Sequence, residues 1–168
     1  ALSSAASDVY KRQVYGNLGI MFPMITSVSE VQKVLEICKT VREELQAEQI
    51  PYAEKIELGI MIETPAAAII SDQLAPLVDF FSVGTNDLTQ YTLACDRQNP
   101  DIESFCDTHH EAILRLIAWS AKNAHEHGAW IGICGELAAD TSLTERFLRM
   151  GIDELSVSPT FVLKVRDA

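Results

Sequence analysis

Two acidic residues stand where a divalent cation could be bound. Glu63 ends the apolar run IELGIMIE (56–63), and Asp87 follows the apolar run DFFSVG (79–84) after a short turn. Both runs are typical of strands buried on both faces, so each carboxylate falls where a strand leaves the core. Mg²⁺ prefers oxygen ligands and usually takes one or two protein carboxylates, while water and substrate complete its shell. Together Glu63 and Asp87 indicate a Mg²⁺ site.

A purely local role is the alternative for each acid taken alone. Thr64 can cap a helix whose first residue is Pro65. Asp87 can cap a helix over residues 88–92, with Gln90 as its capping-box partner. Capping or solvation of each acid therefore stays open on the sequence alone.

Residues near the acids could hold an anionic ligand. The stretch GTND (84–87) places the Asn86 amide and successive backbone N–H groups at an expected helix start, which suits an anion. Arg97 could clamp a phosphate or carboxylate through two parallel hydrogen bonds, although a loop arginine can equally be solvated. Cys134, in GICGE (132–136), could act as acid, base or nucleophile, or could simply pack in its apolar strand.

The elements that must position these residues alternate along the chain. Five short apolar runs predict strands at 19–25, 56–63, 79–84, 130–136 and 154–158. Between them, apolar residues recur at helical spacing over 31–45, 113–121 and 143–148, and the last two patterns stop at Gly128 and Gly151. Alternating strands and helices predict an α/β fold with parallel strands and right-handed crossovers.

A barrel would bring the ends of all these strands to one mouth. The residues that follow the strands would then face a shared pocket: Glu63, Thr85, Asn86, Asp87, Cys134, Glu136 and Ser158. A complete eight-stranded barrel takes about 250 residues, and the 168 residues here provide five strand–helix units. We therefore predict a partial TIM (β/α)8 barrel.

Composition excludes several classes of protein. A formal net charge of −11 argues against nucleic acid as the main partner, because phosphate backbones are bound by clustered Lys and Arg. No apolar run approaches the ~20 residues that a membrane span needs, and no stretch has the layout of a signal peptide. The four cysteines lack C-x-x-C spacing, so neither a zinc site nor a disulfide framework is predicted, and a reducing cytoplasm fits.

The first thirteen residues, ALSSAASDVYKRQ, are polar and unpatterned and differ from the rest of the chain. We interpret residues 1–13 as a non-native or disordered tail, and residues 14–168 as part of one barrel domain.

Four long motifs carry a family resemblance: IMFPMITSVSEV (20–31), GIMIETPAAA (59–68), DFFSVGTNDLTQYTLACDRQN (79–99) and GICGELAAD (132–140). In order and spacing they resemble the carboxyl-terminal domain of enzyme I of the bacterial sugar phosphotransferase system, the phosphoenolpyruvate–protein phosphotransferases. The resemblance runs from about residue 14 to the end. It implies the last five units of a phosphoenolpyruvate-binding (β/α)8 barrel that forms homodimers in the cytoplasm.

The resemblance also implies roles for individual residues. Glu63 and Asp87 become the Mg²⁺ ligands, Asn86, Asp87 and Arg97 bind substrate, and Cys134 protonates the enolate to give pyruvate. In the family a separate amino-terminal part carries the histidine that passes the phosphoryl group to the phosphocarrier protein HPr. Because that part and the upstream strands are absent here, we expect this chain alone to be inactive.

Two alternatives remain beside this resemblance. The first is the barrel domain of a pyruvate–phosphate dikinase or a phosphoenolpyruvate synthase, which share looser versions of the motifs and use ATP. The second is a non-catalytic dimerisation or regulatory module, which would need the helices but not Glu63, Asp87 and Cys134 together. A partial barrel would also leave an edge strand and apolar surface uncovered.

Overall fold

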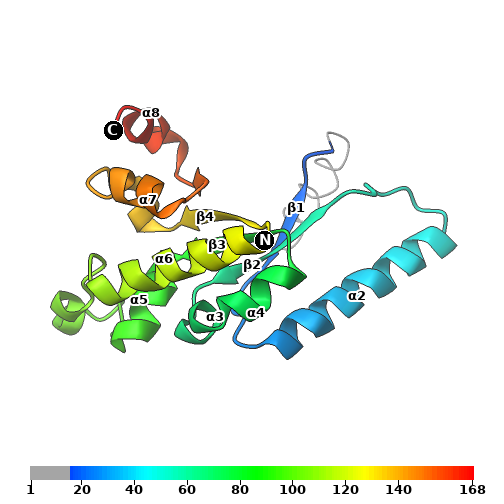
Figure 1. The fold of residues 1–168 in the computed structure, drawn as a ribbon, viewed down its shortest axis with the longest axis horizontal. Coiled ribbons are helices and arrows are strands. Elements are labelled where there is room, and N and C mark those ends of the chain that lie inside the picture. Colours follow the sequence, from blue (N-terminus) through cyan, green and yellow to red (C-terminus); the bar gives the residue numbers. More distant parts are fainter. Residues whose placement is uncertain (1–15) are drawn as a thin grey trace.

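The structure is a computed structural model that describes residues 16–168, and the predicted tail over residues 1–13 lies outside the described residues. Five parallel strands form a single sheet (Figure 1). They are β1 (Gly19–Phe22), β2 (Glu57–Ile62), β3 (Phe80–Gly84), β4 (Trp130–Cys134) and β5 (Glu154–Leu155). All five predicted strands are confirmed, although most end earlier than their apolar runs, because the last residues of those runs turn out of the sheet.

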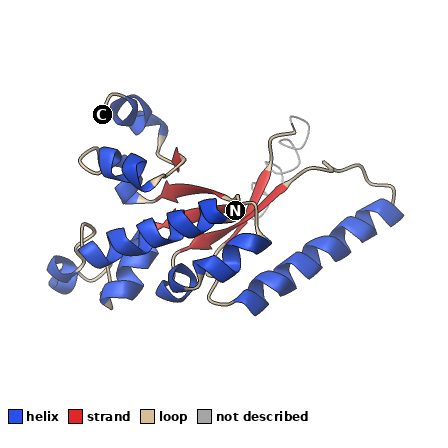
Figure 2. Cartoon of the chain, viewed as in Figure 1, coloured by secondary structure: helices blue, strands red, loops and turns tan. Residues whose placement is uncertain are grey.

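Helices fill the connections between successive strands, and α8 follows the last strand (Figure 2). They are α2 (Val28–Ala47), α3 (Pro65–Ile69), α4 (Ser71–Leu74), α5 (Thr85–Leu93), α6 (Glu111–Glu126), α7 (Thr144–Met150) and α8 (Val162–Arg166). Short 3₁₀ turns lie at Ala75–Leu77, Pro100–Phe105, Glu136–Ala139 and Pro159–Phe161. As predicted, α6 stops before Gly128 and α7 stops at Gly151, and both glycines have the positive φ of a helix end, 80° and 84°.

The strand order identifies the architecture. Each strand pairs in parallel with the next one in the chain, in the order β1-β2-β3-β4-β5. A doubly wound sheet reverses its strand order at a switch point, and no such reversal occurs among the described strands. Sequential parallel order with helical crossovers is the arrangement of a (β/α) barrel, and the five units form an arc of one. The predicted α/β fold and partial barrel are confirmed.

The core lies between the sheet and the helices that cover it. Alternate residues of the three central strands face the helices and are fully buried: Ile60, Ile62, Phe81, Val83, Ile131 and Ile133. In Figure 1, α3, α4, α5 and α6 gather on this side of the sheet, where α6 contacts the other three. Burying each large aliphatic or aromatic side chain contributes about 1.5–3 kcal/mol. This packing fixes the strands, and with them the residues at their carboxyl ends.

The opposite face of the sheet is closed less completely. Phe80 and Trp130 stack there with ring centroids 4.5 Å apart, and the Trp130 indole N–H donates to Glu57. Among the described strands, β1 and β5 form the two edges of the sheet. Beside β1, Ile37 and Val41 of α2 stay 63% and 45% exposed, which is the uncovered apolar surface expected of a partial barrel. Within residues 16–168, none of the helices combines the length and the apolar character that crossing a membrane requires.

Candidate functional site

The two carboxylates predicted to share a metal lie at the ends of neighbouring strands. Glu63 directly follows β2, and Asp87 lies in the first turn of α5, which begins where β3 ends. Glu63 is 3% exposed, whereas the Asp87 side chain is 35% exposed. A methyl group placed on Gly84, at the end of β3, would come within 2.7 Å of Glu63 Oε2. Glu63 therefore leans across the end of β3, toward Asp87.

The electrostatics of Glu63 are unfavourable in the absence of a cation. Burial raises the pKa of the Glu63 carboxyl, and the neighbouring charge and hydrogen bond of Asp87 raise it further. The Met24 backbone N–H partly opposes this by donating to Glu63 Oε1 at 2.7 Å. Met24 adopts a left-handed conformation, φ 57°, just past the end of β1. Three strand ends thus converge on one buried carboxylate.

The carboxylate pair fits a hard divalent cation. The described part of the chain contains no group of three or more His, Cys, Asp or Glu side chains placed to hold a metal. A zinc site would need three or four such ligands, whereas Mg²⁺ usually takes one or two carboxylates and keeps its other positions for water and substrate oxygens. A cation between Glu63 and Asp87 would relieve the repulsion between two adjacent carboxylates, one of them buried.

The local roles considered for the two acids have different outcomes. Thr64 caps α3 as expected, because its hydroxyl accepts from the Ala67 N–H at 3.1 Å and donates to the Ile25 carbonyl. Capping by Asp87 is wrong, since α5 begins at Thr85, with Gly84 at the N-cap and no side-chain cap. The helix starts directly after β3 and so takes Asp87 into its first turn, where the helix dipole favours a negative charge. Solvation is wrong for Glu63, which is buried.

Groups suited to an anion lie beside the carboxylates. The Arg97 guanidinium is 3.7 Å from the Asp87 carboxylate, and the Arg97 backbone N–H donates to Gln90 Oε1. Asn86 Oδ1 accepts from the Glu136 N–H at 3.2 Å, which leaves the amide NH₂ directed elsewhere as a donor. Asn86 and Arg97 line one hollow of about 540 Å³. The three predicted substrate-binding residues, Asn86, Asp87 and Arg97, therefore lie together.

Cys134 ends β4 on the same edge of the sheet. It is the register partner of Gly84 on β3, so its side chain leaves the sheet on the face where Glu63 packs against Gly84. The half-buried thiol donates to the Val83 carbonyl at 3.3 Å. The Thr85 hydroxyl donates to the Cys134 carbonyl at 2.9 Å, which ties the end of β4 to the start of α5.

A glycine is required immediately after Cys134. Gly135 has φ 88°, a conformation that other residues adopt only with strain. A Cβ on Gly135 would also meet Thr85 Oγ1 at 2.6 Å and Asn86 Oδ1 at 3.1 Å. The backbone here passes so close to β3 and α5 that only glycine fits, and this close approach gives the Glu136 N–H its contact with Asn86.

The last residue expected at the mouth is Ser158, after β5. It shares a second hollow of about 520 Å³ with Asn86, Gly135 and Glu136. Two contributors were missed: the Met24 N–H, which holds Glu63, and Gln90, which holds the Arg97 backbone. Both contacts involve backbone N–H groups, which have no residue-specific signal. Only their positions in the sequence could have indicated them, because Met24 follows a strand and Gln90 lies on the helix that also carries Asn86.

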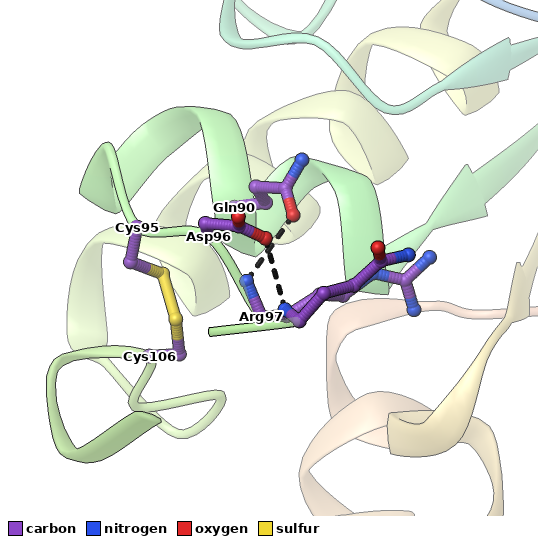
Figure 3. Close-up of a disulfide and its surroundings, with 6 residues drawn as sticks. Gln90, Cys95, Asp96, Arg97 and Cys106 are labelled. Carbon is purple, nitrogen blue, oxygen red and sulfur yellow. Dashed lines mark hydrogen bonds between the residues drawn. A yellow bond between two sulfur atoms is a disulfide. The ribbon is translucent and has the colours of Figure 1, made fainter. Parts of the chain in front are cut away.

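One expectation about the cysteines is wrong. Cys95 and Cys106 form a disulfide with their Cα atoms 5.8 Å apart, although no disulfide framework was expected. Cys38 and Cys134 are free thiols. Spacing alone could not reveal this pair, because it joins the end of α5 to the end of a 3₁₀ turn that folds back on it. Figure 3 shows the disulfide beside Arg97, whose side chain extends away from it.

The comparisons with known proteins agree with this geometry. A protein-family model described as PEP-utilising enzyme, PEP-binding domain, matches residues 3–168. The chain belongs to this family. Curated relatives of the chain include the phosphoenolpyruvate-protein phosphotransferases of Lactococcus lactis subsp. cremoris and Priestia megaterium. The L. lactis protein is 45% identical over 99% of this chain and 30% of its own length. The P. megaterium protein is 46% identical over 93% of this chain and 27% of its own length.

The resemblance drawn from the four motifs is thereby confirmed. The chain spans about 30% of the length of these relatives. Solved structures share its fold. A citrate lyase from Burkholderia xenovorans aligns with a TM-score of 0.65 at 20% identity, over 87% of this chain and 46% of its own. RipC from Yersinia pestis aligns with a TM-score of 0.60 at 13% identity, over 96% and 69%. At such identities the likeness concerns the fold alone.

Proposed function

We propose that this chain binds phosphoenolpyruvate and Mg²⁺ as part of a phosphoenolpyruvate–protein phosphotransferase. The observation that carries the proposal is the buried Glu63 carboxylate held against Asp87, with Arg97 3.7 Å from Asp87. Burying a carboxylate beside a second one costs stability unless a cation is bound there. A non-catalytic module would gain nothing from that cost. The names of the curated relatives favour the phosphotransferase over the ATP-dependent dikinases and synthases.

Different residues at the carboxyl ends of the strands would bind Mg²⁺ and the anionic groups of phosphoenolpyruvate. Glu63 and Asp87 would hold Mg²⁺, which when bound supplies Lewis-acid stabilisation of charge on the phosphoryl and enolate oxygens. The Arg97 guanidinium offers a planar fork of donors for a phosphate or a carboxylate. The Asn86 NH₂ group donates a further hydrogen bond, and its orientation is fixed because Asn86 Oδ1 accepts from Glu136. Phosphoenolpyruvate presents both a phosphate and a carboxylate to these donors.

Cys134 is suited to the proton transfer. When the phosphoryl group leaves phosphoenolpyruvate, an enolate remains, and pyruvate forms only after C3 of the enolate takes a proton. The Cys134 thiol supplies that proton and becomes a thiolate. The hydrogen bond from Thr85 to the Cys134 carbonyl holds the residue at the mouth, and the Val83 carbonyl accepts from the thiol until substrate is bound.

The remaining steps would take place outside the span of this chain. By analogy with the resembled family, the phosphoryl group passes to an enzyme histidine, then to the phosphocarrier protein HPr, and serves sugar uptake. The same proposal includes a homodimer and a cytoplasmic location. The chain spans about 30% of the length of its relatives. We therefore expect it to bind phosphoenolpyruvate but not to phosphorylate HPr by itself.

Calorimetric titration of the 168-residue chain with phosphoenolpyruvate, with and without Mg²⁺, tests the proposal. We expect binding that requires Mg²⁺, and a loss of at least about tenfold in affinity in Glu63→Gln and in Asp87→Asn. Asp72→Asn is the matched control, because Asp72 is an exposed acid on α4, away from the mouth. Binding that ignores Mg²⁺, or equal losses in Asp72→Asn, would contradict the proposed site.

A further inference from the structure

The disulfide lies in the wall of the candidate site. Cys95 and Cys106 line the same hollow as Asn86, Arg97 and Glu136. We propose that Cys95 and Cys106 form a reversible redox site, at which a low-molecular-weight thiol opens the bond and so releases the Arg97 loop. In the oxidised state the loop is held against the mouth, and in the reduced state it is not.

The loop concerned, residues 96–105, is tied at both ends by the disulfide. Cys95 follows α5 and is anchored there, because its N–H donates to the Gln90 carbonyl at 3.1 Å. Cys106 follows the 3₁₀ turn Pro100–Phe105, at the far end of the loop. Arg97 is two residues from Cys95, so the covalent bond restricts the segment that places the guanidinium.

The non-covalent restraints on Arg97 are weak by comparison. Its guanidinium lies 3.7 Å from Asp87, with the two side chains 43% and 35% exposed, and exposed ion pairs of this kind contribute little. Its backbone N–H donates to the Gln90 side chain at 3.3 Å, a bond that lies at the surface. Other hydrogen bonds in this loop, from the Gln98 and Asp101 N–H groups, join residues of the loop to one another. The disulfide is therefore the strongest described restraint that fixes the loop to the barrel.

The hollow also gives a small thiol access to the bond. Cys95 is 4% exposed, whereas Cys106 is half-buried and lines the hollow. The thiolate of glutathione would attack Cys106 Sγ, and the S–S bond would break with Cys95 leaving as a thiolate that takes a proton. A second glutathione thiolate then displaces Cys106 from the mixed disulfide. The balance is one protein disulfide plus two thiols giving a protein dithiol and glutathione disulfide, and the reverse reaction closes the loop.

The compartment argues for a switch rather than a permanent cross-link. If the chain works in the cytoplasm, as the proposed function has it, thiol pools there keep most cysteines reduced. Disulfides that do form in that compartment are usually transient or redox-sensing. Because this bond borders the anion-binding groups, its oxidation or reduction can change the position of Arg97 and so the affinity of the site. This step rests on the proposed function, whereas the opening of the loop does not.

Trypsin cleavage after Arg97 measures the opening without reference to activity. The 168-residue chain is equilibrated in glutathione buffers from fully reduced to fully oxidised, and the Cys95–Cys106 bond is quantified by peptide mapping. We expect cleavage at Arg97 to become about tenfold faster or more on reduction, because cleavage follows the population of the open loop. Cys106→Ser should be cleaved fast in every buffer, and the matched control Cys38→Ser should behave as the unmodified chain. Failure to form the bond reversibly, or equal cleavage in both states, would overturn the redox site.

Titration with phosphoenolpyruvate and Mg²⁺ in the two states tests the link to the site. We expect the oxidised chain to bind at least several-fold more tightly than the reduced chain, and Cys106→Ser to match the reduced chain. Equal affinity in both states would overturn the link to Arg97. Redox-dependent cleavage with no phosphoenolpyruvate binding in either state would instead refute the proposed function and support the redox site alone.

Discussion

Gly84→Ala would test the proposed metal site by displacing the Glu63 carboxylate without replacing either proposed ligand. Gly84 has φ −82° and ψ 84°, so alanine can adopt its backbone conformation without left-handed strain. The added methyl group, however, would lie 2.7 Å from Glu63 Oε2 and 2.9 Å from Glu63 Cβ. Ordinary contact begins at 3.4 Å, so the carboxylate oxygen must shift by about 0.7 Å.

That displacement affects two interactions of Glu63. The hydrogen bond from the Met24 N–H, 2.7 Å long, would be stretched or broken, and a bond to a buried charged group contributes about 1.5–3 kcal/mol. Mg²⁺ demands near-ideal geometry with oxygen ligands at about 2.1 Å, so a shift of this size removes Glu63 from the shell. We expect the affinity for Mg²⁺ with phosphoenolpyruvate to fall about tenfold to a hundredfold, since about 1.4 kcal/mol corresponds to a factor of ten.

Gly59→Ala is the matched control for this experiment. Its methyl group would meet the Phe80 ring at 2.4 Å, so it strains the sheet without touching Glu63. Overpacking of this kind costs about 1–3 kcal/mol of stability. Urea denaturation gives the stability of each variant, and calorimetric titration gives its Mg²⁺ affinity. Gly84→Ala should lose Mg²⁺ affinity and Gly59→Ala should keep it. Unchanged Mg²⁺ affinity in folded Gly84→Ala would show that Glu63 is not a ligand.

Three further predictions concern the same edge of the sheet. Burial raises the pKa of Glu63 above 4.5, so the contribution of Glu63 to the free energy of unfolding should fall as pH rises from about 4.5 through the raised value. Urea unfolding measures this as the free energy of unfolding of the unmodified chain minus that of Glu63→Gln at each pH. An increase of this difference with pH would contradict the prediction. In a longer phosphotransferase chain that includes these 168 residues, Cys134→Ala should slow deuteration of the pyruvate methyl group in D₂O with Mg²⁺ by about 10²–10⁴-fold, followed by NMR, without weakening phosphoenolpyruvate binding. Gly135→Ala should cost more stability in urea than Gly128→Ala, because both have positive φ but only Gly135 would clash with Thr85.

The strands and helices were predictable because their signals are local and periodic. A fully buried strand is a short apolar run, and the runs that contain Ile60, Phe81 and Ile131 become the centre of the sheet. Glycine marks helix ends because it tolerates positive φ, which is why Gly128 and Gly151 indicated the ends of α6 and α7 correctly. The start of α5 was misplaced because the helix begins directly at the end of β3 and its N-cap is Gly84, which has no side chain to cap it.

The site was predictable only where side-chain chemistry identifies it. Carboxylates, an amide and a guanidinium are visible in a sequence, so Glu63, Asp87, Asn86 and Arg97 could be named before their convergence was known. The Met24 N–H could not, because any residue supplies a backbone donor and only the conformation at φ 57° aims it at Glu63. The Cys95–Cys106 bond also escaped prediction, since it depends on how an irregular loop folds back onto a helix end.

The arrangement of the site depends on the sheet rather than on any one loop. Each described strand end places one residue of the candidate site: Met24 after β1, Glu63 after β2, Asp87 after β3, Cys134 on β4 and Ser158 after β5. Parallel register places all of these ends at one edge, and the buried strand residues hold that register. A carboxylate as buried as Glu63 would be expelled from a loop that could move, because its charge would reach water. It stays where it is because the Met24 N–H after β1 donates to it and the end of β3 lies against it, and the proposed Mg²⁺ would offset the cost of holding it there.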